Sequence, residues 1–283
     1  MIYLNGEFMP ISEAKVSVMD RGFLFGDGVY EVIPVYSRRP FRLAEHLRRL
    51  GASLDGIRLA NPHSEAEWTA LVDRIVDQAD SSDQQDYLQI TRGADSKRNH
   101  AFPKVIRPTV FAMSEPLLPP PLEQPEQGIA AVSAADNRWL RCDLKAVSLL
   151  ANCLLRQLAV EAGCAETVLF RDGFLTEGAA SNIFVVKDGV LLAPMKNHLM
   201  LPGITYDVVL ELAARNGLEV EVRDVLEREV RNASELWMSS STKEVLPIVS
   251  LAGRPIGDGK PGPVFEEVYG WYQEFKQSVM HRG

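Results

Sequence analysis

Lys145 is the first residue whose position suggests chemistry. It lies in RWLRCDLKAVSLL, immediately before a segment with helical character. A helix N-terminus lowers the pKa of a nearby lysine, and such a lysine can form a Schiff base with a carbonyl group. Most lysines at such places are merely solvent-exposed, so for Lys145 taken alone that interpretation is the stronger one.

Glu177 is the second residue whose position suggests chemistry. It lies in TEGAASN, residues 176–182, between small residues and next to apolar strand-like segments. One interpretation is a carboxylate directed into a pocket that Gly178, Ala179 and Ala180 line closely. The other is a turn at the end of a strand, with Glu177 in water. The spacing favours neither.

Two segments could bind anions. LPGIT, residues 201–205, opens a predicted helix, where free backbone N–H groups and the Thr205 hydroxyl could bind a phosphate. SSST, residues 239–242, could add hydroxyl donors. In the predicted loop TRGADSKRNHAFP, Arg98 and His100 together suit a carboxylate. An N-cap, a turn and solvated loop residues are the respective alternatives.

The elements that must position these residues differ between the two parts of the chain. In the N-terminal part, residues 28–36, 87–93 and 107–115 read as strands. Helical spacing of leucines covers 42–57, and a second helix over 64–79 begins with a capping box of Ser64 and Glu67. Strands with helices on one side predict an α+β domain.

The C-terminal part is predicted to be mostly β. A helix spans 147–163, and two hairpins turn at Asp172-Gly173 and Asp188-Gly189. A tight loop leads into a helix within 201–218, and strands follow in 218–225, 235–242 and 244–257. Between the two parts, residues 114–128 are rich in proline, and such a segment cannot lie inside a helix or a central strand. We therefore expect a smaller N-terminal domain (1–116), a proline-rich linker (117–127) and a larger C-terminal domain (128–283).

Composition excludes several classes of protein. The formal net charge of -8 disfavours nucleic-acid binding, and no apolar stretch approaches the ~18–20 residues that span a bilayer. The three cysteines and five histidines follow no metal-site spacing, so no metal is expected. An odd number of cysteines makes structural disulfides improbable and favours the cytoplasm.

The four candidate features taken together are more informative than any one of them alone. A Schiff-base lysine, a buried carboxylate, a phosphate-binding helix start and a carboxylate-binding pair are what pyridoxal 5'-phosphate requires to act on amino acids. From DRGFLFGDGVYEV to GRPIGDGKPG, the chain resembles the class IV (fold-type IV) aminotransferases. RWLRCDLK, TEGAASNIF and LPGIT are specific for the class, and Tyr30 with Arg98-x-His100 resembles its D-amino acid branch.

The resemblance implies a role for each matching residue. Lys145 would be the Schiff-base lysine and proton shuttle, and Glu177 would pair with the pyridinium nitrogen. Leu201 would pack on the cofactor ring, and the phosphate would be bound by Arg49, Ile204, Thr205, Ser240 and Ser241. Tyr30, Arg98 and His100 would bind the substrate α-carboxylate, the last two reaching in from the partner of a homodimer.

The implied reaction is a ping-pong transamination of D-amino acids, of the type D-alanine plus 2-oxoglutarate to pyruvate plus D-glutamate. A branched-chain L-amino acid aminotransferase or an aminodeoxychorismate lyase would share the lysine and glutamate motifs. A non-catalytic binding protein with the same fold is a third alternative. The chain departs from the class at Tyr206 and Ala193, and from the nearest branch at Ala179, Ala180 and Ser241. These departures concern phosphate binding and leave Lys145 and Glu177 unaffected.

Overall fold

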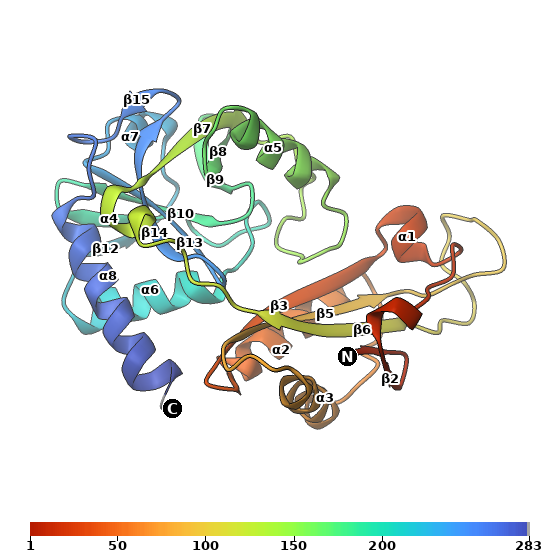
Figure 1. The fold of residues 1–283 in the computed structure, drawn as a ribbon. Coiled ribbons are helices and arrows are strands. Elements are labelled where there is room, and N and C mark those ends of the chain that lie inside the picture. The colour runs from red at the N-terminus through yellow and green to blue at the C-terminus, as the bar shows by residue number, and fades with distance from the viewer. Residues whose placement is uncertain (282–283) are drawn as a thin grey trace. The chain divides into compact units, whose positions relative to one another are not determined.

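The computed structural model describes residues 1–281, which form two units (Figure 1). The first unit contains residues 1–118 and 144–149 with the described residues Met280 and His281, and the second contains 119–143 and 150–279. Both units combine strands with helices, so the predicted α+β class is confirmed. No helix within 1–281 is both long and apolar enough to cross a membrane.

The first unit is built on a six-stranded antiparallel sheet in the order β2-β1-β6-β5-β3-β4. Its strands are β1 (Ile2–Leu4), β2 (Glu7–Met9), β3 (Gly28–Tyr36), β4 (Arg39–Pro40), β5 (Gln84–Thr91) and β6 (Thr109–Pro116). Its helices are the 3-10 turn η1 (Ile11–Glu13), α1 (Arg21–Phe25), α2 (Leu43–Gly56) and α3 (Glu65–Gln78).

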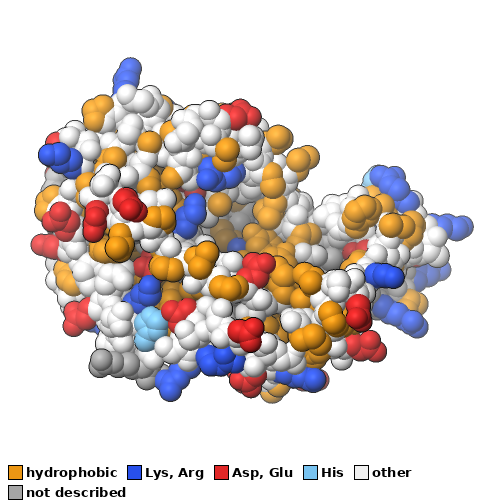
Figure 2. All heavy atoms as spheres, in the orientation of Figure 1, with side chains coloured by type: hydrophobic (Ala, Val, Ile, Leu, Met, Phe, Trp, Pro, Cys, Tyr) orange, Lys and Arg blue, Asp and Glu red, His pale blue; other side chains and the backbone are white. Residues whose placement is uncertain are grey.

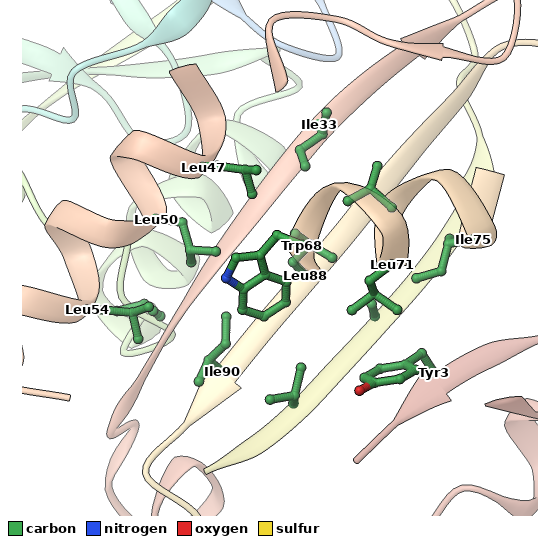
Figure 3. Close-up of a cluster of buried hydrophobic side chains, with 14 of the residues drawn as sticks. Tyr3, Ile33, Leu47, Leu50, Leu54, Trp68, Leu71, Ile75, Leu88 and Ile90 are labelled. Carbon is green, nitrogen blue, oxygen red and sulfur yellow. The ribbon is translucent and has the colours of Figure 1, made fainter. Parts of the chain in front are cut away.

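Helices α2 and α3 bury their apolar stripes against one face of this sheet (Figure 3). Leu47, Leu50 and Leu54 of α2 are buried there, as their helical spacing predicts. Trp68 of α3 is also buried, opposite the inward-facing residues of β3 and β5. The predicted capping box is confirmed, since the Ser64 N–H donates to Glu67 Oε2 (2.7 Å) and the Glu67 N–H donates to Ser64 Oγ (3.3 Å).

The second unit contains a nine-stranded mixed sheet in the order β12-β11-β10-β13-β14-β7-β8-β9, with β15 paired to β14. Its strands are β7 (Ile129–Ala135), β8 (Glu166–Arg171), β9 (Phe174–Gly178), β10 (Asn182–Lys187), β11 (Val190–Ala193), β12 (Val220–Val222), β13 (Glu235–Ser240), β14 (Glu244–Leu251) and β15 (Arg254–Pro255). Its helices are α4 (Glu123–Gln127), α5 (Leu150–Glu161), α6 (Ile204–Arg215), α7 (Glu227–Arg231), α8 (Pro263–Phe275) and the π-helical turn η2 (Lys276–Met280).

Two turns in this unit follow directly from sequence. The hairpins β8–β9 and β10–β11 turn at Asp172-Gly173 and Asp188-Gly189, as predicted. All four residues have φ between 52° and 81°, the left-handed region that this turn type requires.

One expectation was wrong. The proline-rich segment contains helix α4, with Pro125 inside it. Pro125 is in the first turn, where a missing N–H removes no intrahelical hydrogen bond, so the proline is tolerated there.

Residues 144–149 lie within the predicted C-terminal domain but pack with the first unit. Ala146 forms an antiparallel bridge with Val29, and the Val147 N–H donates to the Gly28 carbonyl (3.0 Å). The segment thus extends the edge of the first sheet beside the start of β3.

Candidate active site

Lys145 is fixed by its backbone. Its N–H donates to Ser53 Oγ on α2 (3.2 Å), and its carbonyl accepts from the Tyr30 N–H on β3 (2.9 Å). Its ammonium nitrogen lies 4.2 Å from the centroid of the Tyr30 ring. The structure therefore brings together two predicted site residues, Lys145 and Tyr30. A cation over an aromatic face is a favourable contact.

Arg49 belongs to a buried polar cluster that sequence reasoning did not find. Its Nε donates to Glu31 Oε1 (2.8 Å) and its Nη2 to Glu31 Oε2 (2.7 Å). His46 Nδ1 lies 2.8 Å from Glu31 Oε2, and Glu31 and His46 are fully buried. A two-point ion pair fixes the plane and direction of a guanidinium. Glu31 and His46 therefore determine how Arg49 is presented.

The charge of Glu31 and of His46 follows from burial and from their mutual contacts. Burial raises the pKa of Glu31, but Arg49 and His46 outweigh it and lower the pKa to about 2. Burial also lowers the pKa of His46, which keeps its ring neutral near pH 7. The ionised Glu31 can only accept this hydrogen bond, so His46 carries its hydrogen on Nδ1 and donates it. A carboxylate between the core residues Val29 and Ile33 was the available sequence signal.

Arg98 and His100 both lie close to the ring of Phe25. The Arg98 guanidinium carbon is 5.0 Å, and the His100 ring centroid 5.2 Å, from the Phe25 centroid. Buried Arg21 holds the loop by donating to the carbonyls of Asn99 (2.5 Å) and His100 (3.1 Å). Both predicted side chains are exposed, and Figure 2 shows Lys and Arg side chains gathered over this end of the first unit.

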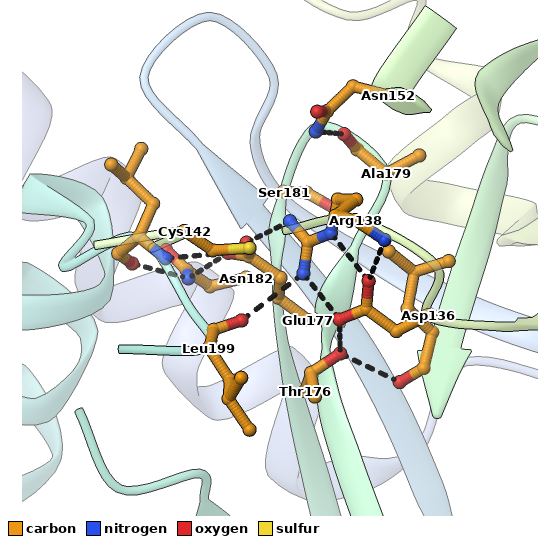
Figure 4. A network of polar contacts seen from close by, with 12 residues as sticks. Asp136, Arg138, Cys142, Asn152, Thr176, Glu177, Ala179, Ser181, Asn182 and Leu199 are labelled. Carbon is orange, nitrogen blue, oxygen red and sulfur yellow. Dashed lines mark hydrogen bonds and ion pairs between the residues drawn. The ribbon is translucent and has the colours of Figure 1, made fainter. Parts of the chain in front are cut away.

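Glu177 lies on β9 in the second unit and is buried, which excludes the solvent-exposed turn (Figure 4). Its carboxylate pairs with Arg138 and accepts from Asn182 Nδ2 (3.3 Å) and from the Leu201 N–H (3.1 Å). Asn182 Nδ2 also donates to the Leu201 carbonyl (3.0 Å). Glu177 and Leu201, both predicted site residues, are thus held together by Asn182.

Arg138 is shared with a second carboxylate. Its Nε and Nη2 donate to Asp136 (2.9 and 2.8 Å), which Arg171 (3.1 Å) and the Thr176 hydroxyl (2.9 Å) also contact. Burial raises the pKa of Glu177 to about 7; Arg138 opposes the shift, whereas the charge of Asp136 adds to it. The sequence contained no signal for Asp136 or Arg138 as partners of Glu177.

The predicted anion-binding helix start also lies in the second unit. Gly203 is the N-cap of α6, and no side chain caps the helix. A Cβ on Gly203 would lie 2.0 Å from Asn182 Oδ1, so only glycine allows this close approach. Ile204 and Thr205 of the first turn are buried. Ser240 ends β13, and its hydroxyl accepts from the Lys243 N–H (3.1 Å) in the turn that contains Ser241.

These residues fit pyridoxal 5'-phosphate chemically. Lys145 offers an amine for a carbonyl carbon, and Glu177 a buried acceptor for a ring N–H. Within the first unit Arg49 is a cation, and within the second unit the uncapped start of α6 offers N–H donors; each is a type of group that binds phosphate. Gly203 at the start of α6 allows the side chain of Asn182, which also bonds Glu177 and Leu201, to pack directly against the backbone.

Similar proteins were found by sequence and by structure. A D-alanine aminotransferase of Bacillus licheniformis is 42% identical over 267 residues, 94% of each chain, and one of Staphylococcus aureus (strain MW2) is 37% identical over 98% of each. A solved branched-chain amino acid aminotransferase of Escherichia coli superposes with a TM-score of 0.89 at 29% identity, covering 99% of this chain and 94% of that one. A second branched-chain enzyme, from T.th. and solved with pyridoxamine 5'-phosphate, gives a TM-score of 0.87 at 28% identity, covering 96% and 92%.

Residues 28–251 match the family described as amino-transferase class IV. Members of this class depend on pyridoxal 5'-phosphate and act on small amino and oxo acids, in agreement with the cofactor expected from the sequence. The resemblance drawn from RWLRCDLK, TEGAASNIF and LPGIT is confirmed, and the chain belongs to the class IV aminotransferases.

Proposed function

We propose that the protein transfers amino groups between D-amino acids and 2-oxo acids, with D-alanine and 2-oxoglutarate as a representative pair. The relatives named D-alanine aminotransferase are 42% and 37% identical over nearly the whole chain. The observation that carries the proposal is that Arg98 and His100 both lie close to Phe25. This pair suits an α-carboxylate, and we assign it that role together with Tyr30.

Pyridoxal phosphate, when bound, supplies a carbonyl carbon that reacts with amines and a ring that withdraws electrons from the substrate Cα. Lys145 would be the residue that holds the cofactor, and its amine would be the base that moves the proton at the substrate Cα. The backbone bonds to Ser53 and Tyr30 fix the lysine, so only its side chain must move. One base serves one face of the substrate, so the position of the α-carboxylate decides which enantiomer reacts.

The other site residues bind and orient. Glu177 accepts the hydrogen bond of the ring nitrogen and favours its protonated state. Arg138 and Asn182 keep the Glu177 carboxylate in one orientation. The phosphate is assigned to Arg49, the N–H groups of Ile204 and Thr205, and the hydroxyls of Ser240 and Ser241. Leu201 is assigned to the face of the ring.

The proposed homodimer is supported by an exposed apolar stripe on α5. Leu150, Leu154 and Leu158, spaced four residues apart, are 74%, 60% and 46% exposed, while Leu155 and Ala159 of the same helix are buried. Exposed apolar stripes of this kind mark subunit contacts. A second copy of the chain is the proposed occupant, and it would supply Arg98 and His100 to its partner's site. Light scattering of Leu154→Glu tests this assembly, and an unchanged mass would contradict it.

A cytoplasmic location is proposed as well. Cys142, Cys153 and Cys164 are all free thiols, which is the usual state in a reducing compartment.

The assigned carboxylate trap is tested with Arg98→Ala. We expect kcat/KM for D-alanine to fall about tenfold or more, because a charged hydrogen bond to the substrate is lost. Arg107→Ala, which removes an exposed arginine from the same loop, is the matched control. Full activity of Arg98→Ala would contradict the trap.

The second candidate is branched-chain L-amino acid transamination, which the two solved structures favour by their fold. L-leucine as the better substrate of the wild-type protein would decide for it.

A further inference from the structure

Ser239 on β13 presents an unexplained buried hydroxyl. The residue is 1% exposed, and its Oγ has no hydrogen-bond partner within residues 1–281. Buried hydroxyls are nearly always hydrogen-bonded, and an unpaired one requires an explanation such as a ligand that the site is built to receive. Ser240 differs, because its hydroxyl already accepts from the Lys243 N–H.

The face of the sheet that carries Ser239 is covered by α6. Ser239 lies directly opposite Asn182 in the β10–β13 pair, and two residues earlier Trp237 lies opposite Phe184. The Phe184 ring is 6.4 Å from Trp237 and stacks on Tyr206 of α6 at 5.0 Å. Side chains two residues apart on a strand share a face. Ser239 and Asn182 therefore face α6.

The start of α6 lies over the Asn182–Ser239 pair. A Cβ on Gly203, the N-cap, would lie 2.0 Å from Asn182 Oδ1 and 3.3 Å from the Tyr206 Cβ. Cross-strand neighbours have Cβ atoms about 4.5–5.5 Å apart, so the Ser239 side chain is a direct neighbour of Asn182, the residue that the start of α6 approaches. That turn has no side-chain cap, and its residues Ile204 and Thr205 are buried.

We propose that Ser239 Oγ donates a hydrogen bond to the phosphate of the cofactor at the N-terminus of α6. An uncapped helix start with an adjacent hydroxyl donor selects an anion, and a phosphate monoester has oxygens for both. The assignment rests on the proposed function and adds a ligand to the phosphate site.

The test compares Ser239→Ala with wild type, both freed of cofactor, in binding to pyridoxal 5'-phosphate, inorganic phosphate and pyridoxal. Loss of a hydrogen bond to a charged group weakens binding about tenfold or more. We expect that loss for the two phosphate-bearing probes and none for pyridoxal. Thermal unfolding of the cofactor-free variant should not be impaired, because no internal hydrogen bond is removed.

Thr167→Val is the matched control, since the buried Thr167 hydroxyl already donates to the Leu155 carbonyl (2.7 Å). It should leave all three affinities unchanged. If Ser239→Ala does not fold, Ser239→Cys keeps nearly the same volume with a much weaker donor and should show the same selective loss.

Wild-type affinity for both phosphate-bearing probes in the Ser239 variant would overturn the assignment. If wild type binds inorganic phosphate through Ser239 but does not bind pyridoxal 5'-phosphate, the hydroxyl remains a phosphate ligand and the proposed function fails. The two failures are therefore distinguishable.

Discussion

Two buried arginine–carboxylate pairs of the molecule behave in opposite ways. In the first unit, Arg49 lowers the pKa of Glu31 to about 2. In the second unit, Glu177 also pairs with an arginine, Arg138, yet its pKa is raised to about 7. Both carboxylates are buried, so burial alone does not distinguish them.

Burial is the largest influence on both carboxylates and raises both pKa values, and the two differ in how many charged hydrogen bonds oppose it. Glu31 receives two guanidinium bonds from Arg49 and a third bond from His46. Arg138 instead directs two of its nitrogens to Asp136, whose negative charge adds to the cost of ionising Glu177. A glutamate–arginine pair therefore plays two roles. In the first unit Glu31 stays ionised and fixes the position of Arg49. In the second unit Glu177 can gain or lose a proton near neutral pH.

The largest effect is expected at the lysine beside the first pair. Lys145→Ala should lower kcat for D-alanine by about 10²–10⁴-fold, because the proton-transferring amine is lost. It should leave the Glu31–Arg49 pair intact, so thermal stability should be close to wild type. Steady-state kinetics and a melting curve measure both. Lys187→Ala is the exposed control, and substantial residual turnover in Lys145→Ala would break the assignment.

The comparison predicts unequal stability losses for the two glutamates. Glu31→Gln leaves Arg49 buried beside a neutral partner and should cost about 3–5 kcal/mol of the unfolding free energy. Glu177→Gln should cost clearly less, because Arg138 keeps its pair with Asp136. Urea unfolding of both variants without cofactor gives the values. Equal losses would show that the sharing of Arg138 does not matter.

The two carboxylates should also give opposite pH dependence. Glu177 binds its proton more tightly in the folded state, about 7 against 4.5, so its contribution to stability is present below pH 4.5 and is lost as the pH rises toward 7. Glu31 contributes above pH 4.5 and loses its contribution as the pH falls toward 2. Each slope is at most about 1.4 kcal/mol per pH unit.

These slopes are measured as differences in unfolding free energy between wild type and each glutamine variant across pH 3 to 8. The Glu177→Gln difference should change between pH 4.5 and 7, and the Glu31→Gln difference only at lower pH. A Glu177→Gln difference that is flat from pH 4.5 to 7 would contradict the raised pKa.

The smallest effect concerns two helix starts. Ser64→Ala removes the side-chain cap of α3 and should cost about 1 kcal/mol without changing cofactor affinity. The start of α6 has no such cap and is assigned to a ligand instead. A change in pyridoxal phosphate affinity in Ser64→Ala would contradict this distinction, in which the start of α3 is structural and the start of α6 binds a ligand.

Sequence patterns predicted the local features of the fold well. The Asp-Gly hairpins, the Ser64–Glu67 cap and the leucine stripe of α2 depend on residues close in the chain, and all are confirmed. The helix around Pro125 was missed because the proline falls in a first turn. The attachment of residues 144–149 to β3 depends on contacts about a hundred residues apart, which no local pattern records.

For the candidate site, too, the sequence indicated local features but not contacts between residues far apart in the chain. Lys145, Glu177, Arg98 and His100 were predicted as site residues because their types and neighbours suit the chemistry. Their supporting partners were not found, because each is a distant contact. Glu31 is 18 residues from Arg49, and Arg138 is 39 from Glu177. A carboxylate on a core-facing strand position was the only local hint of Glu31.

The central claim is that this chain removes the amino group of D-amino acids with Lys145 as the base. It is tested most directly by the visible absorption of the cofactor-loaded protein in a single half-reaction, with D-alanine or L-leucine added alone. The account predicts loss of the absorption band with D-alanine only, with one pyruvate formed per site. Loss of the band with L-leucine only would contradict the carboxylate-trap assignment and place the protein with the branched-chain enzymes.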